Sequence, residues 1–350
     1  MQQFSSTIQI ALESQTFMKI FLFGFAGFLL STLLTPLYTH LAYKRQWWKK
    51  PRTAAATGEQ ATMYMKLHNE KHNHHTPTMA GIIFVIATGA ITLAANLMRT
   101  ETWLPLGAMA GAGLIGLIDD VINVHSNGGI AGMRSKIKLF SIVVVSIIGG
   151  LWFYNKLGVN SIHIPIVDRT LVMGWLIVPL FVLVVVSTAN AVNITDGLDG
   201  LAGGLSATAF AMYAIIAFLE KRYGIAGFCM TIVGTLLSYT WFNIFPARFF
   251  MGDVGSFALG TALGVVAMLT DTVLLLPIIG MVFVIEAGSS LLQISSKKLR
   301  HGKKIFAIAP IHHNFEAKGW PETKVTMRFW IVGQIMGVIG LIIFFLGNQF

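Results

Sequence analysis

Residues 174–220 read GWLIVPLFVLVVVSTANAVNITDGLDGLAGGLSATAFAMYAIIAFLE, which is two apolar stretches separated by a short polar segment. A helix needs about 20 mostly apolar residues to cross the hydrocarbon core of a bilayer. The stretches 174–194 and 201–220 both have that length. They predict two membrane-spanning helices that are joined by a tight polar connection at 195–200.

Similar stretches recur along the chain. Eight more lie at 17–41, 78–98, 103–123, 137–156, 223–245, 255–270, 272–296 and 328–347. Of the 350 residues, 55% are hydrophobic and only 11% are charged, against roughly a quarter charged in an ordinary soluble domain. A soluble enzyme, a disordered chain and a nucleic-acid-binding module fit this composition poorly. We therefore expect an all-α polytopic membrane protein with about ten transmembrane helices, forming a single integral membrane domain over 1–350. The single Cys229 excludes a disulfide framework and cysteine-based metal sites.

The basic residues predict the orientation of these helices. Nineteen of the 25 Lys and Arg residues lie in or directly beside the predicted loops, at about 42–77, 124–136, 195–200, 246–254 and 297–327. Lys and Arg mark the cytoplasmic loops of membrane proteins. We therefore expect these loops in the cytoplasm and both termini on the outer (periplasmic) side. The net charge of +10 follows from this asymmetry and does not indicate a nucleic-acid partner.

Five aspartates lie at three predicted span ends on that same side. Asp119 and Asp120 end GLIDD, Asp196 and Asp199 lie in NITDGLDG, and Asp253 lies in FMGDVGS. Carboxylates near the edge of a bilayer are costly unless they are hydrated, paired or bound to a cation. Proteins typically hold Mg²⁺ with one or two carboxylates together with substrate phosphates and water, and the neighbouring glycines let backbone N–H groups approach phosphate. Each motif alone also fits a helix N-cap. Together they predict a phosphate–metal site for Mg²⁺ on the cytoplasmic face.

Histidines and one buried acid are further candidates. His312 and His313 lie in the long basic loop at 297–327, where a neutral His can transfer protons and a charged His can contact phosphate. Glu286 lies inside the predicted span 272–296, which fits either a functional carboxylate or a structural hydrogen bond to a neighbouring helix. Another group of histidines fits a wet basic loop better than a metal site; it comprises His68, His72, His74 and His75.

Five segments together resemble one family. They are TPTMAG (76–81), GLIDD (116–120), STANAVNITDGLDGLAGG (187–204), WFNIFPARFFMGDVGS (241–256) and APIHHNFEAKGWPETKVTMRFW (309–330). In order and spacing they resemble the phospho-N-acetylmuramoyl-pentapeptide transferases of bacterial cell-wall synthesis. That family belongs to the polyprenyl-phosphate N-acetylhexosamine-1-phosphate transferase superfamily, which shares the aspartate segments. The segment 309–330 resembles the muramoyl-pentapeptide branch.

The resemblance implies a ten-helix, Mg²⁺-dependent transferase of the bacterial cytoplasmic (inner) membrane. It implies transfer of phospho-MurNAc-pentapeptide from UDP-MurNAc-pentapeptide to undecaprenyl phosphate, which gives lipid I and UMP. Matched by motif, Asp253 resembles the Mg²⁺ ligand and a catalytic residue, and His312 resembles a catalytic histidine. Asp119 and Asp120 resemble the catalytic pair that meets the lipid phosphate or acts as base. The substrate-binding positions are Thr78, Lys136, Asn193, Asp196, Asp199, Asn243, Phe250, Gln293 and His313.

Within that set, Asn193, Asp196 and Asp199 match the pocket for uridine and diphosphate, and Phe250 is expected to stack on uracil. The chain also departs from the family pattern at a few positions. Asn314 replaces a third consecutive histidine, so we assign it no acid–base role. The other departures are Asn73 and His74 where the family tends to have a basic pair, Asn123 where it usually has Lys, and TPTMAG where it has TPTMGG.

Other interpretations stay open. A related transferase could use another UDP-N-acetylhexosamine, although the segment 309–330 argues against it. A secondary transporter would need acids near the bilayer midplane and an inverted repeat, and only Glu286 lies at that depth. Direct attack by the lipid phosphate and prior attack by an aspartate both fit the sequence. As partners we expect the two substrates and membrane lipid, with a homodimer as one possible assembly.

Overall fold

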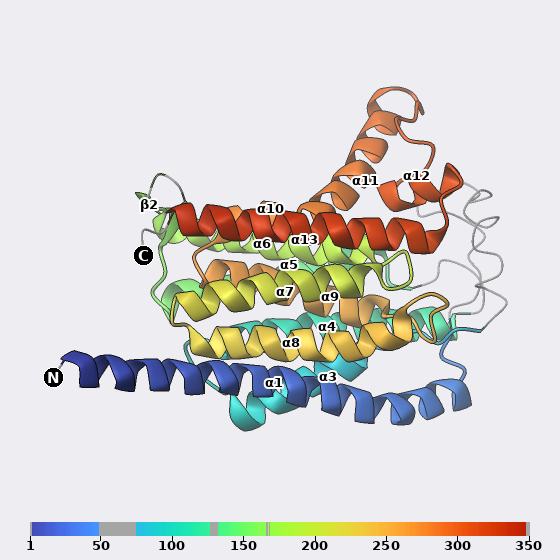
Figure 1. The fold of residues 1–350 in the computed structure, drawn as a ribbon. Helices are drawn as coiled ribbons and strands as arrows, with labels where there is room; N and C mark the ends of the chain where they lie inside the picture. The colour runs from blue at the N-terminus through green and yellow to red at the C-terminus, as the bar shows by residue number, and fades with distance from the viewer. Residues whose placement is uncertain (1, 49–74, 127–131, 166, 168, 348–350) are drawn as a thin grey trace.

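The computed structural model describes residues 2–48, 75–126, 132–165, 167 and 169–347, and within these the side chains from residue 13 onward. The long helices lie side by side with nearly parallel axes, apart from Met281–Leu299, which points away from the others (Figure 1). They are α1 (Gln2–Lys44), α3 (Gly81–Ala95), α4 (Trp103–His125), α5 (Ser135–Asn155), α6 (Ile177–Thr195), α7 (Leu201–Leu219), α8 (Tyr223–Asn243), α9 (Gly252–Leu269), α11 (Met281–Leu299) and α13 (Glu322–Gly347). Shorter elements are α10 (Leu276–Ile279), α12 (Ile311–Ala317) and the 3₁₀ turns η1 (Gly174–Leu176) and η2 (Val273–Leu275).

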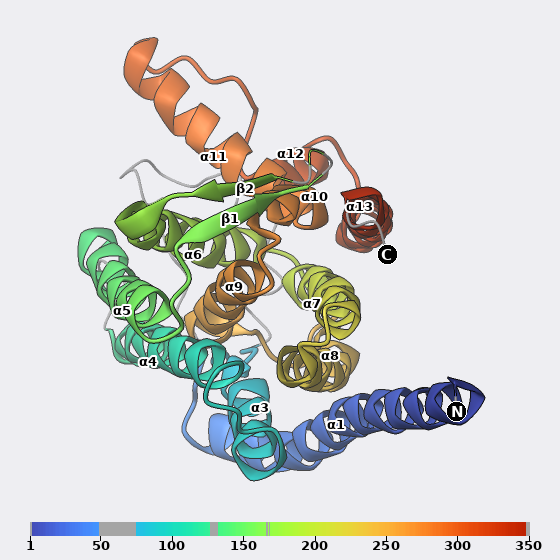
Figure 2. The same ribbon diagram turned by 90° about the vertical axis from the view of Figure 1, so that its left-hand side faces the viewer.

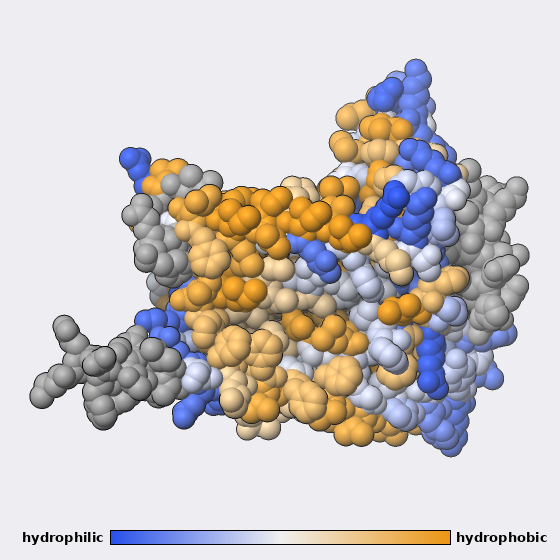
Figure 3. Space-filling model, viewed as in Figure 1, coloured by the Kyte–Doolittle hydropathy of each residue, from blue (hydrophilic) through white to orange (hydrophobic). Residues whose placement is uncertain are grey.

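The described helices confirm a polytopic membrane protein. Eight of them are long and apolar enough to cross a bilayer, and a ninth span results if Val273–Ile279 and Met281–Leu299 are counted as one. Figure 3 shows an apolar band across the middle of one face, with hydrophilic residues gathered toward both ends. The chain is therefore a multi-pass membrane protein.

Two of the ten expected spans differ from simple helices. The stretch 78–98 forms only the 15-residue helix α3, because the preceding TPTMA segment instead hydrogen-bonds through Ala80 N to Phe250 O at 3.0 Å. The stretch 272–296 is bent by 81° between its two helices. Gly280 lies at the break, and α11 leaves the bundle at a steep angle (Figure 1).

A short hairpin departs from the all-helical expectation. Strands β1 (Ser161–Ile164) and β2 (Arg169–Val172) pair antiparallel, with Ser161 opposite Val172. Both segments are rich in β-branched residues, which favour extended backbone. The backbone N–H of His163 donates to Asp271 Oδ1 at 2.9 Å, which fixes the hairpin at the end of the bundle where α9 terminates.

Helix α9 forms the interior of the bundle. Figure 2 looks along the helices and shows α9 surrounded by α4, α6, α7 and α8. In its 18 residues, 94% of the positions are buried. The first turn of this enclosed helix carries Asp253, so the neighbouring helix ends can place their polar side chains around that carboxylate.

Glycines allow α4 and α9 to approach closely. A Cβ atom added at Gly116 would lie 2.2 Å from the carbonyl oxygen of Asp253, and one added at Gly81 would lie 2.3 Å from Gly255 Cα. Neither position can accept a side chain without moving a helix backbone. The close contact at Gly116 therefore sets the separation between the GLIDD segment and Asp253.

We expect Gly116→Ala to destabilise the protein by roughly 1–3 kcal/mol, because overpacking against backbone cannot be relieved by a side-chain rotation. The measurement is the melting temperature of the purified protein in detergent. Gly107→Ala is the matched control on the same helix, since a Cβ at Gly107 would meet nothing within 4 Å. Equal melting temperatures for the two variants would contradict the close-contact argument.

Candidate functional site

A lysine connects two of the predicted aspartates. Lys138 Nζ of α5 donates to Asp119 Oδ2 of α4 at 2.8 Å and to Asp253 Oδ2 of α9 at 2.5 Å. The side chain of Asp119 is 2% exposed and that of Asp253 is 16% exposed. Two carboxylates from different helices thus share one ammonium group at the end of the bundle.

The remaining oxygens of this pair are also hydrogen-bonded. Asp119 accepts from the backbone N–H of Met133 at 2.6 Å and from Asn123 Nδ2 at 3.0 Å. Asn193 Nδ2 of α6 lies 3.2 Å from Asp253 Oδ1. The ends of α4, α5, α6 and α9 therefore converge on one polar cluster, which we name the Asp119–Lys138–Asp253 cluster.

Asp120 points in a different direction from Asp119. It is completely buried, and its Oδ2 accepts from the backbone N–H of Val254 in the first turn of α9 at 3.0 Å. A carboxylate at this place favourably meets the positive end of a helix. Gly252 has a φ of +75°, and a Cβ there would lie 2.5 Å from Asp120 Oδ2. Asp120 thus fixes the start of the helix that carries Asp253.

The NITDGLDG segment is tied to the loop that follows α8. Asp199 Oδ2 accepts from the backbone N–H of Ala247 at 3.0 Å. Asn243 Oδ1 accepts from Gly200 N at 2.9 Å, and its Nδ2 donates to Phe249 O at 2.8 Å. Asn243 therefore uses both ends of its amide to hold backbone. Asp196 of the NITDGLDG segment and Phe250 of the loop after α8 are half-buried.

The TPTMAG segment also packs against the loop after α8. The backbone N–H of Phe250 donates to Pro77 O at 2.8 Å. Thr78 is 1% exposed, and its carbonyl oxygen accepts from the hydroxyl of Tyr38 at 2.5 Å. Thr78 thus lies against the loop that carries Phe250.

His312 forms a buried pair with Glu286. Its Nδ1 lies 2.8 Å from Glu286 Oε2, and both side chains are 0% exposed. On the other side of the ring, Nε2 lies so close to Gly197 that an added Cβ would be 2.3 Å away. We name the segment 297–327, which contains α12, the histidine loop. The contact of His312 with Gly197 brings this loop against the NITDGLDG segment. The sequence left Glu286 as either a functional carboxylate or a structural hydrogen-bonding group. In the structure it is hydrogen-bonded, and its partner is His312 of α12.

His313 has an acidic partner of its own. Its Nδ1 lies 2.7 Å from Glu316 Oε2, and its ring centroid is 4.1 Å from that of His312. Burial lowers the pKa of His313, although the neighbouring Glu316 carboxylate opposes that shift. The ring is therefore held mainly in its neutral form near neutral pH.

Asn314 and Gln293 hold a loop. Asn314 Oδ1 accepts from the backbone N–H of Ala307 at 3.2 Å. Gln293 Oε1 accepts from Ile305 N and Phe306 N, both at 3.0 Å, and its Nε2 donates to Phe306 O at 2.8 Å. The side chain of Gln293, one of the expected substrate-binding positions, thus contacts the backbone of the segment before α12.

Sequence reasoning missed Lys138 and proposed Lys136 instead. Lys136 is exposed, whereas Lys138 is partly buried between the carboxylates. The position of Lys138 inside the predicted span 137–156 could have identified it. A charged side chain within a span is costly, so it usually has an ionic partner or a functional role.

The Asp119–Lys138–Asp253 cluster fits a divalent cation. Among the residues that the structure describes, there is no group of three or more His, Cys, Asp and Glu side chains arranged to hold a metal ion. Two carboxylates nevertheless face one position, which the positively charged ammonium group of Lys138 occupies. Mg²⁺ commonly has one or two protein carboxylates and takes its other ligands from substrate phosphates and water.

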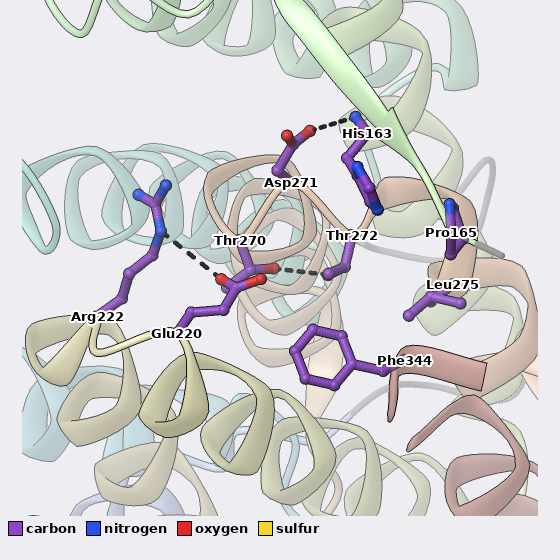
Figure 4. A pocket seen from close by; sticks show the side chains of 9 residues that line it. All are labelled: His163, Pro165, Glu220, Arg222, Thr270, Asp271, Thr272, Leu275 and Phe344. Carbon is purple, nitrogen blue, oxygen red and sulfur yellow. Dashed lines mark hydrogen bonds and ion pairs between the residues drawn. The ribbon is translucent and has the colours of Figure 1, made fainter. Parts of the chain in front are cut away.

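A separate pocket of about 350 Å³ lies at the opposite end of α9 (Figure 4). None of the predicted site residues lines it. Its acidic groups are Asp271, which accepts from His163 N, and Glu220, which lies 3.6 Å from Arg222 Nε. Burial raises the pKa of Glu220 to about 7, although Arg222 opposes the shift.

This pocket predicts a pH dependence of stability. Because Glu220 binds its proton more tightly in the folded state, the contribution of this group to stability falls as pH rises from about 4.5 through about 7. We expect the stability gain of Glu220→Gln over the wild type to grow by roughly 1–2 kcal/mol between pH 5 and pH 8, allowing for the partial exposure of the group. Melting temperatures at the two pH values measure it. Lys221→Gln, an exposed neighbour, is the control, and an equal pH dependence of Glu220→Gln and wild type would disprove the prediction.

Comparisons with known proteins agree with the motifs. A family model described as Glycosyl transferase family 4 matches residues 102–271. The phospho-N-acetylmuramoyl-pentapeptide-transferase of Geobacillus thermodenitrificans is 36% identical over 322 residues, which cover 91% of this chain and 95% of that protein. That of Syntrophus aciditrophicus is 41% identical over 286 residues, covering 76% and 79%. That of Methylacidiphilum infernorum is 39% identical over 300 residues, covering 79% and 80%.

Proposed function

Because the chain belongs to the phospho-N-acetylmuramoyl-pentapeptide-transferase family, we propose that it transfers phospho-MurNAc-pentapeptide from UDP-MurNAc-pentapeptide to undecaprenyl phosphate. The products are lipid I and UMP, and the reaction is a step of peptidoglycan synthesis in a bacterial membrane. The observation that carries this proposal is the Asp119–Lys138–Asp253 cluster, which lies at the end of a membrane bundle. A lipid-borne phosphate and a soluble nucleotide can meet at such a place.

The reaction requires charge compensation, since both substrates are polyanions. We assign Asp253 as the Mg²⁺ ligand, with Asp119 as the second carboxylate that faces the same position. Held by these carboxylates, Mg²⁺ would neutralise charge on the diphosphate and stabilise UMP as a leaving group. Lys138 adds a positive charge at the same position, and it can move from the carboxylates to a phosphate oxygen when substrate binds.

Direct attack is the route that the residues favour. An oxygen of the lipid phosphate attacks the phosphorus that is linked to the sugar, and the bond from that phosphorus to the bridging oxygen of UMP breaks. Any proton on the attacking phosphate passes to Asp119, although a phosphate monoester is already mostly ionised at neutral pH. The role of the chain is chiefly to hold the two phosphates in line. Asp120 contributes indirectly, through its contact with the first turn of α9.

The nucleotide is proposed to bind between the NITDGLDG segment and the loop after α8. Asp196 and Phe250 supply a polar group and an aromatic face there, while Asn243 keeps the two loops together. His312 and His313 close this region from the side of α12, with Glu286 orienting His312. We place this end of the bundle in the cytoplasm, because the basic loops adjoin it and UDP-sugars are soluble donors.

Release of UMP by the purified full chain in detergent tests the proposal. We expect release only when Mg²⁺, undecaprenyl phosphate and UDP-MurNAc-pentapeptide are all present. UDP-GlcNAc in place of the pentapeptide donor is the control for a related transferase. Turnover of UDP-GlcNAc alone would assign the chain to that other activity, and transport of substrate into vesicles without UMP release would indicate a transporter.

A further inference from the structure

A second pocket lies on the flank of the bundle, at the same end as the Asp119–Lys138–Asp253 cluster. Its volume is about 480 Å³. It is lined by Pro36, Thr39, His40, Tyr43 and Lys44 of α1 and by Arg248 of the loop after α8. We name it the α1 basic pocket. Two elements that are distant in sequence thus line one shallow, open space.

The charge of this pocket is entirely positive. Lys44 and Arg248 make no ion pair with a carboxylate in the part of the chain that the structure describes, and no acidic side chain lines the space. The guanidinium of Arg248 lies 5.9 Å from the ring centroid of Phe242, and its backbone N–H donates to Phe242 O at 2.9 Å. Arg248 is therefore positioned by its neighbours, and among the described residues no carboxylate pairs with its guanidinium.

The surroundings of the pocket are apolar and exposed. On α1, Leu37 and Leu41, which alternate in sequence with the lining residues, are 59% and 37% exposed. In the segment that precedes Arg248, Trp241 and Phe245 are 77% and 47% exposed. In a membrane protein such side chains face lipid. Figure 3 shows the corresponding boundary, with hydrophilic residues at the right-hand end of the molecule directly beside the apolar band. The α1 basic pocket thus lies where headgroups of the bilayer meet its acyl chains.

We propose that the α1 basic pocket binds the phosphate headgroup of an anionic membrane phospholipid, whose acyl chains lie along the exposed leucines of α1. Basic pockets at a membrane interface bind anionic headgroups in this way, and an arginine suits phosphate because it offers several donors in a planar arrangement. The hydroxyl of Tyr43 is a further donor in the lining.

The occupant is a bilayer phospholipid and not the lipid substrate of the proposed reaction. Lys138 belongs to α5, whereas the pocket is formed on α1, and Figure 2 shows α4 and α3 between these two helices around the bundle. A lipid phosphate held by Lys44 and Arg248 is therefore on a different flank from the Asp119–Lys138–Asp253 cluster.

The pocket shares a loop with the proposed nucleotide region. Ala247, next to Arg248, donates to Asp199, and Phe249 accepts from Asn243. A phosphate bound to Arg248 would hold this loop in the conformation that joins it to the NITDGLDG segment. Binding of a bilayer lipid would then order one wall of the nucleotide region.

Native mass spectrometry of the purified full chain tests this proposal, with phosphatidylglycerol as the probe and phosphatidylcholine as the neutral comparison. We expect the double variant Lys44→Gln/Arg248→Gln to bind phosphatidylglycerol roughly 30-fold more weakly than wild type, since each basic residue near a membrane surface contributes about fivefold. The matched control is Lys303→Gln/Lys304→Gln, which removes the same charge from the loop after α11 and should change binding less than about twofold.

Four outcomes would overturn the proposal. An equal loss in both double variants would show that only total charge matters. Tight binding of undecaprenyl phosphate at Lys44 and Arg248, without phosphatidylglycerol, would make the pocket a substrate site. Competition by inorganic phosphate alone at similar concentration would make it a simple anion site. Loss of a dimer in the Lys44→Gln/Arg248→Gln variant, with unchanged lipid binding, would make it an interface between two copies. The readout is bound lipid, so it does not depend on the proposed reaction.

Discussion

Asp253→Asn is expected to lower the rate of UMP release by about 10³-fold or more, because the variant loses the carboxylate assigned to Mg²⁺ and one of the two charges that face Lys138. Asparagine has nearly the same size, and Asp253 is the single acidic residue of α9, in its first turn. The protein should therefore remain folded. Turnover at saturating substrate and increasing Mg²⁺ measures the effect.

The control for this variant is Asp271→Asn, which removes a carboxylate from the opposite end of the same helix region. It should retain turnover within about twofold. A second readout is the shift in melting temperature on adding Mg²⁺ with UDP-MurNAc-pentapeptide, which Asp253→Asn should lose. Near-normal turnover by Asp253→Asn would disprove the metal assignment, and a preserved Mg²⁺-dependent shift would place the metal elsewhere.

His312→Ala is expected to lower turnover by roughly 10²–10⁴-fold, the usual range of a general acid–base contribution. His312 is completely buried between Glu286 and Gly197, so its ring lies between the histidine loop and the proposed nucleotide region. Glu286→Gln should reduce turnover by a smaller factor and shift the pH profile, because glutamine can still hold the ring but lacks the charge. Turnover between pH 6 and pH 9 measures both effects.

Asn314 supplies the internal comparison for the histidine loop. Its Oδ1 accepts a hydrogen bond from the backbone N–H of Ala307, which is a loop-holding role. Asn314→His should leave the rate within about tenfold, which corresponds to about 1.4 kcal/mol of activation free energy. If Asn314→Ala proves as damaging as His312→Ala, the loop acts by positioning the substrate, and proton transfer by His312 is wrong.

The transmembrane helices could be predicted because length and apolarity are local properties of sequence. The stretch 103–123 became the helix Trp103–His125, and 201–220 became Leu201–Leu219. The bend between α10 and α11 was not predictable in the same way, since Gly280 interrupts an apolar run without changing its composition. Composition predicts that a segment spans the membrane. The direction that the chain takes after a break such as Gly280 depends instead on packing against other helices.

The site was predictable by residue type but not by contact. The acidic span ends and the histidine loop lie at one end of the molecule, as expected from the sequence, yet a partner of Asp253 is Lys138, which lies 115 positions away in the sequence. A single sequence contains no information on such a pairing. Likewise, nothing in the residue type of Gln293 or Asn243 shows that their amides hold backbone.

The enclosure of α9 also determines how the molecule responds to the thickness of its membrane. This helix has only 18 residues and hardly meets lipid, whereas the peripheral spans Glu13–Lys44 and Glu322–Gly347 have 32 and 26 residues and are mostly lipid-facing. A bilayer that thickens or thins acts on a helix through its lipid-facing surface, and long helices accommodate the mismatch by tilting. The outer helices therefore absorb such changes, while the depth of Asp253 in the bundle is fixed by protein contacts.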